Sequence, residues 1–145
     1  MRELKKLQFL VETREKAARV AVETAKQRLT QAQEAERQQG ETVKDYAENA
    51  EARRRARNKE LLSGPTSTSQ IALNSLQFAL SKEEINNELV KLGTLTENTR
   101  ESEAIVEEQN QALRDLVMKQ KKLEELQKKI AKLHRRKELS KSNSR

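Results

Sequence analysis

The chain has 145 residues, of which 37% are charged, 34% belong to the broad hydrophobic set and only 2% are aromatic. Three Gly and one Pro are too few turn residues for a set of strands or for alternating strands and helices. Nearly unbroken runs of Ala, Leu, Glu, Lys, Gln and Arg are typical of long helices. We therefore predict an all-α protein without the compact core of an enzyme.

Catalytic and metal-binding residues are sparse. Cysteine is absent and His134 is the single histidine, which excludes a disulfide framework and a thiolate metal site. No glycine-rich phosphate loop or nucleophile elbow occurs. Neighbouring carboxylates such as Glu83 and Glu84 point in different directions on a helix. The sequence predicts a chain that is no enzyme, with no metal, cofactor or small-molecule substrate, and an exposed His134.

No segment approaches the ~18 consecutive apolar residues of a membrane span. The opening MRELKKLQFLVETREK meets charged residues before the apolar core of a signal peptide is complete. We expect a soluble, intracellular protein.

The net charge of +7 is concentrated at the two chain ends. Residues 119–145 hold eleven Lys or Arg against three Glu, a net charge of +8. Residues 1–19 hold six cations against three Glu, a further +3. Both ends are therefore basic, whereas the residues between them are not.

The first long helix is predicted over residues 1–62. A heptad pattern places small or apolar residues at two positions, with Leu4, Val11 and Ala25 at one and Leu7 and Ala21 at the other. The only strong break follows at 63–69, SGPTSTS. There Gly64 permits a positive φ, Pro65 removes a donor and disfavours helix before it, and the hydroxyls can cap a helix.

The second long helix is predicted over residues 70–139, followed by a disordered basic tail at 140–145. Its apolar positions change phase by one residue between Leu95 and Ile105, which would alter a supercoil locally. Neither helix can bury its own apolar stripe, so we predict a long antiparallel two-helix coiled-coil hairpin. Its two ends would meet, and residues with numbers summing to about 132 would face each other across the hairpin.

In that register Gly40 and Gly93 lie at the same level. Each glycine weakens its helix by ~1 kcal/mol relative to alanine, which predicts a soft joint there. The alternative is that the two glycines coincide by chance.

Basic clusters leave two other functions open. The cations from Arg53 to Lys59 and those of the C-terminal end could neutralise phosphates, as in a nucleic-acid-binding helical arm. Few aromatic side chains are present to stack on bases, and the cations circle the helices, which argues against nucleic acid. A generic coiled-coil scaffold or chaperone is the second alternative. Tyr46 and Phe78 either pack in the interface or anchor a docking surface.

The order of features resembles that of the FliJ/YscO (SctO) family, the stalk proteins of bacterial type III export machines. The resemblance covers essentially the whole chain and rests on its layout: a Leu-rich opening with Arg14-Glu15 and Ala17-Ala18, Asp45-Tyr46, the loop SGPTSTS, Leu76-Gln77-Phe78 and a basic C-terminus. Two positions depart from the family pattern. Ala50 stands where another aromatic residue is expected, and Lys82 where an apolar residue is usual.

The resemblance implies a non-enzymatic, cytoplasmic stalk at the periphery of the inner-membrane export apparatus, either flagellar or that of a virulence injectisome. Its open end would dock in the hexameric export ATPase and promote assembly and activity of that ring, through Leu4, Leu7, Val11, Arg14, Lys132, Arg135 and Arg136. Its other end would contact the cytoplasmic domain of the export gate through Gln39, Val43, Tyr46 and Phe78, and would handle export chaperones.

Overall fold

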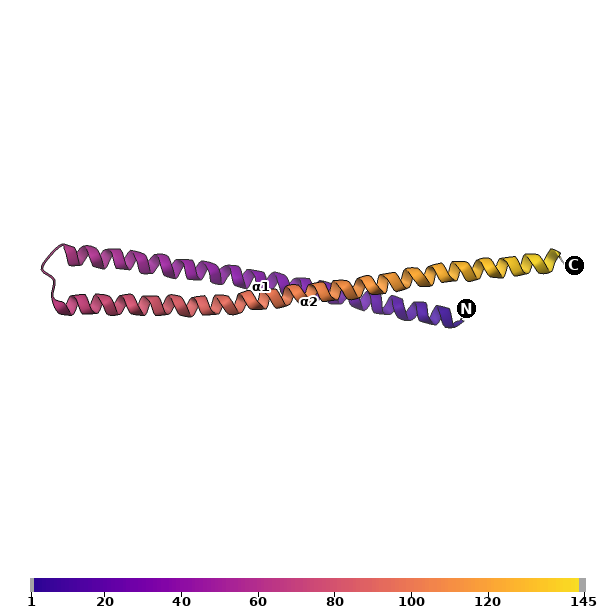
Figure 1. Cartoon of the computed structure of the whole chain (residues 1–145), viewed down its shortest axis with the longest axis horizontal. Coiled ribbons are helices and arrows are strands. Elements are labelled where there is room, and N and C mark those ends of the chain that lie inside the picture. Colours follow the sequence, from indigo (N-terminus) through magenta and orange to yellow (C-terminus); the bar gives the residue numbers. More distant parts are fainter. Residues whose placement is uncertain (1, 144–145) are drawn as a thin grey trace. The chain divides into compact units, whose positions relative to one another are not determined.

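The computed structural model describes residues 2–143, and it contains two long helices and no strand in that range (Figure 1). Helix α1 spans Arg2–Leu62 and helix α2 spans Thr68–Asn143. The two helices pack against each other, which confirms the prediction of an all-α helical hairpin.

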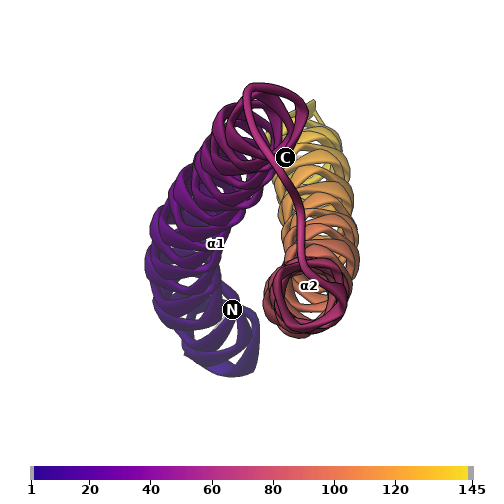
Figure 2. The ribbon, with the colours of Figure 1, turned by 90° about the vertical axis from the view of Figure 1, so that its left-hand side faces the viewer.

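The hairpin divides into two compact units. Unit 1 pairs residues 2–27 of α1 with residues 104–143 of α2, and unit 2 is the continuous segment Arg28–Glu103, which contains the turn. Within unit 2 the two helical segments run antiparallel on either side of the turn, which Figure 2 shows from the turn end. Both chain ends belong to unit 1, as the hairpin topology requires.

The turn holds its shape through side-chain hydroxyls. Ser67 Oγ accepts a hydrogen bond from the Gln70 backbone N–H at 3.2 Å, and Gln70 Oε1 accepts one from the Ser67 N–H at 3.1 Å. This reciprocal pair is a capping box that starts α2 at Thr68. At the end of α1, Ser63 Oγ donates to Glu60 O at 2.9 Å and Thr66 Oγ1 donates to Leu61 O at 2.7 Å. Hydroxyls therefore satisfy some of the backbone groups that each helix end leaves free.

Gly64 does not use the conformational freedom that we expected of it. No residue described, glycine or otherwise, has a positive φ. The α1 end is therefore not closed by a left-handed residue, because Ser63 and Thr66 take over the carbonyls that such a cap would satisfy. Pro65 favours an extended conformation at Gly64, which is sufficient to end the helix.

The bounds of the second helix differ from the prediction. α1 ends at Leu62, where we placed its end, but α2 begins at Thr68 and continues to Asn143. Because of the capping box, α2 begins two residues earlier in the chain than the predicted residue 70. Residues 140–143 extend the helix instead of forming a disordered tail. The last two residues of the predicted tail lie outside the described range.

The seam of α1 is only half as predicted. Val11 and Ala25, on the first heptad position, are buried at 6% and 5% exposure, but Leu7, on the second, is 47% exposed. Gln8 is part-buried in place of Leu7, and Val22, buried at 5%, lies on the same stripe as Gln8. Both choices keep the heptad spacing, so the spacing alone does not distinguish them.

The phase change predicted in α2 does not occur. Ile105 and Leu126 are exposed, whereas Val106 and Gln127 are part-buried. From Ile85 onward the less exposed residues recur at alternating spacings of three and four, as in a continuous coiled coil. Several of these seam positions hold polar residues. The phase change was predicted because only the apolar residues were counted as seam positions.

Polar side chains connect the two helices at four levels and record their register. In unit 1, Gln127 Nε2 donates to Gln8 Oε1. In unit 2 the donor–acceptor pairs are Gln39 with Glu88, Thr96 with Glu36 and Arg57 with Asn74. The residue numbers of these four pairs sum to 127–135, close to the predicted value.

The two mid-helix glycines permit a direct test of their destabilising effect. A Cβ atom added at Gly40 or Gly93 would meet nothing within 4 Å, and both lie inside continuous helices. We expect Gly40→Ala and Gly93→Ala each to raise the free energy of unfolding by ~1 kcal/mol. Urea unfolding followed by circular dichroism measures this change. A loss of stability in either variant would show that a glycine is needed at this level.

Candidate functional site

The open end of unit 1 brings the two basic chain ends together. The Gln8–Gln127 hydrogen bond, at 2.5 Å, aligns the start of α1 with the later part of α2. α2 then continues past the first described residue of α1 (Figure 1). Arg135 and Arg136 lie on this extension and are exposed. The basic charge of both ends is thus presented at one end of unit 1.

Most of the residues predicted for ATPase docking are accessible, but one is not. Leu7, Arg14 and Lys132 are exposed and Leu4 is part-buried. Val11 is buried between the helices, so its side chain is not accessible to a partner in this structure. Its side chain faces α2 because it occupies the heptad position that forms the seam.

Three exposed cations near the end of α2 have no acidic partner among the described residues. Among residues 2–143, no ion pair joins Lys132, Arg135 or Arg136 to a carboxylate. The nearby Glu138 lies 3.3 Å from His134 Nε2, and the His134 side chain is 73% exposed, as predicted. Exposed, unpaired cations create a positive field that attracts acidic surfaces.

Gln39, the first of the residues predicted for the export-gate contact, bonds to the other helix. Gln39 Nε2 donates to Glu88 Oε2 at 2.6 Å and to Glu88 O at 3.0 Å. Lys91 Nζ lies 3.1 Å from Glu88 Oε1. The Gln39 bond first, and Lys91 second, lower the pKa of the Glu88 carboxyl. Gln39 thus joins the helices, and Val43 beside it is part-buried.

Tyr46 and Phe78 do not form one aromatic surface. Tyr46 lines a hollow with Asn49, Ala52, Arg53 and Glu84, whereas Phe78 lines another with Ala47, Ala50, Lys82 and Ile85. Their side chains are 38% and 45% exposed. The Arg54 guanidinium carbon lies 5.1 Å from the centroid of the Phe78 ring, a cation–π contact. The structure therefore offers two separate aromatic positions on unit 2.

Two polar pairs between the helices were not predicted from the sequence. Arg57 Nε donates to Asn74 Oδ1 at 3.0 Å, and Thr96 Oγ1 donates to Glu36 Oε1 at 3.1 Å. The expected register could have identified both pairs, because their residue numbers sum to about the value predicted for facing residues. From the sequence, Arg57 counts only as one of the cations from Arg53 to Lys59 that could neutralise phosphates.

Comparison with known proteins yields no relative. No family model matches the chain, and no curated protein or solved structure is significantly similar to it. Neither α1 nor α2, over the described residues, is apolar enough along its length to cross a membrane. Within the same range, no group of three or more His, Cys, Asp or Glu could hold a metal ion.

The Gln39–Glu88 contact predicts a pH-dependent stability. Because the pKa of Glu88 is lowered in the folded chain, its stabilising effect is complete above its unfolded pKa and is lost as the pH falls through its folded pKa. We expect Glu88→Gln to reduce the loss of stability on acidification below about pH 4.5. Thermal unfolding of both proteins across this pH range measures the effect. An unchanged pH dependence in the variant would contradict it.

Proposed function

We propose that this chain is a non-enzymatic stalk of a bacterial type III protein export apparatus, flagellar or injectisome. Its open end docks in the hexameric export ATPase and promotes assembly and activity of the ring. The observation that supports this proposal is the antiparallel helical hairpin that presents the basic charge of both chain ends at one end of unit 1. The chemistry of ATP hydrolysis belongs entirely to the partner.

Charge favours the open end as the docking surface. The extension of α2 combines Arg135, Arg136 and Lys137 with a single acid, Glu138, and exposes Leu133 and Leu139 beside them. Complementary charge accelerates association and fixes orientation, and exposed leucines supply area to bury. An acidic ring mouth with apolar patches is the partner surface that this end fits.

Unit 2, which contains the turn, is proposed to contact the cytoplasmic domain of the export gate and to handle export chaperones. Tyr46 and Phe78 are partly exposed aromatic side chains on unit 2, and such residues often dominate binding energy at interfaces. Gln39 contributes through the interhelical bond that holds this level of unit 2 together.

The arginines near the turn support a protein partner more than nucleic acid. Arg54 lies on the Phe78 ring, Arg55 pairs with Glu51, and Arg57 bonds to Asn74. Cations engaged in this way form no continuous stripe along which a phosphate backbone could run.

The ATPase contact is tested by charge reversal. We expect Arg135→Glu with Arg136→Glu to reduce stimulation of the hexameric export ATPase of the same organism by about tenfold at low salt. The matched control, Arg55→Glu with Lys59→Glu, makes the same change in net charge near the turn and should keep full stimulation. Hydrolysis rates and ring formation are measured together. Full stimulation by the Arg135/Arg136 variant would refute docking through the open end.

The gate contact is tested separately. Tyr46→Ala and Phe78→Ala should each weaken binding to the purified cytoplasmic domain of the export gate, by about tenfold if the ring is an anchor. Phe9→Ala is the control because Phe9 is 71% exposed and lies on unit 1. Isothermal titration calorimetry gives the affinities. Unchanged affinity in both aromatic variants would exclude these two side chains as anchors.

A further inference from the structure

We propose that the hollow between α1 and α2 beside the turn of unit 2 binds a carboxylate group carried on an apolar stem. None of the residues proposed for the ATPase or gate contacts lines this hollow, although Arg53 also lines the hollow beside Tyr46 and Arg57 the one beside Phe78. The binding test below needs neither the ATPase nor the gate. The ligand is either a free carboxylate or an acidic side chain of a partner, and the shared chemistry is the carboxylate.

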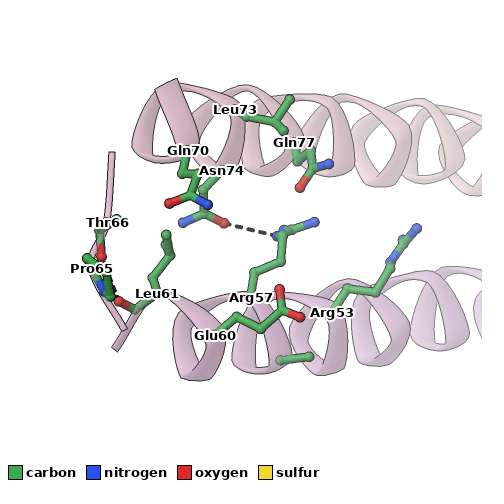
Figure 3. Close-up of a pocket in the computed structure, with 11 residues that line it drawn as sticks. Arg53, Arg57, Glu60, Leu61, Pro65, Thr66, Gln70, Leu73, Asn74 and Gln77 are labelled. Carbon is green, nitrogen blue, oxygen red and sulfur yellow. Dashed lines mark hydrogen bonds between the residues drawn. The ribbon is translucent and has the colours of Figure 1, made fainter. Parts of the chain in front are cut away.

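The hollow has a volume of about 560 Å³ and is lined by both helices and by the turn (Figure 3). Its polar lining includes Arg53, Arg57, Gln70 and Gln77. Ala56, Leu61, Pro65 and Leu73 provide its apolar walls. A concave site with apolar walls and a few convergent polar groups is the usual form of a ligand site.

Arg57 supplies the donor that lacks a partner. Its guanidinium lies between the two helices, where Nε donates to Asn74 Oδ1 at 3.0 Å (Figure 3). Its Nη2 atom is buried and has no hydrogen-bond partner among the described residues. An unsatisfied buried donor on a charged group is costly. Asn74 accepts from one edge of the guanidinium, and Arg57 lines the hollow, so a planar acceptor that enters beside it would meet a donor group held in place.

The charge of the hollow favours a carboxylate over a phosphate. Two arginines and one carboxylate, Glu60, give the lining a net charge of +1, which matches a singly charged anion. The twelve residues of α2 from Gln70 to Ser81 carry no charge at all. A doubly charged phosphate would bring excess negative charge next to Leu61 and Leu73, whereas an apolar stem could cover them.

The site is tested by nuclear magnetic resonance on the full chain. Sodium hexanoate is titrated at constant ionic strength while the Arg57 Nε–H signal and the side-chain amide signals of Gln70 and Gln77 are followed. We expect saturable shifts of these signals. Sodium phosphate and sodium chloride, titrated in the same way, should give weaker and unsaturable changes.

Two substitutions that conserve charge separate a built site from general attraction. Arg57→Lys removes the planar fork and should raise the dissociation constant for hexanoate about tenfold. Arg55→Lys is the matched control, since Arg55 lies outside the lining and its side chain is 80% exposed. Circular dichroism verifies that both variants are folded. Asn74→Ala, which releases the fixed edge of Arg57, should also weaken binding.

A short capped peptide of alternating Glu and Leu distinguishes the two sources of the carboxylate. Tighter binding of the peptide than of hexanoate identifies an acidic side chain of a partner, and the reverse identifies a free carboxylate. The proposal is overturned if neither probe gives saturable shifts, if Arg57→Lys binds as well as Arg55→Lys, or if phosphate binds as tightly as hexanoate. None of these results depends on the ATPase or the gate.

Discussion

Small side chains at the seam of unit 1 limit how much surface the two helices bury against each other. Val11, Val22 and Ala25 are its buried apolar residues, and none is larger than valine. Small side chains let the helices approach, but they bury little area and specify register poorly. In unit 2 the buried residue is Thr99, whose hydroxyl donates to Leu95 O of its own helix. Alignment therefore depends strongly on polar contacts between helices.

Polar interhelical contacts specify one pairing because a shifted pairing would leave their donors unsatisfied. Gln8 with Gln127 fixes unit 1, and Gln39 with Glu88 fixes part of unit 2. The hydroxyl caps at the turn act with them, since they set where α1 ends and where α2 begins. A chain with a thin apolar interface can in this way still fold into one hairpin.

The open end of unit 1 and the region beside the turn differ in the chemistry of their surfaces. The open end of unit 1 presents exposed cations together with leucines on a helical extension, a surface suited to an acidic partner. Beside the turn, several arginines face the uncharged side of α2, and one of them keeps a buried nitrogen without a partner. Because unsatisfied donors are costly, that position gains from a bound acceptor. The proposed stalk and the proposed carboxylate site thus use different residues.

The amino-acid sequence alone determined the helical class, the place of the turn and the approximate facing of residues across it. Composition, the Gly64-Pro65 break and heptad spacing are local signals, and they do not need packing to be read. Tertiary structure decided which heptad position completes the seam, as Gln8 and Val22 replaced Leu7, and it buried Val11 between the helices. It also placed Arg57 against Asn74 and separated Tyr46 from Phe78. These outcomes depend on which side chains of the other helix lie opposite, and a single-helix pattern does not contain that information.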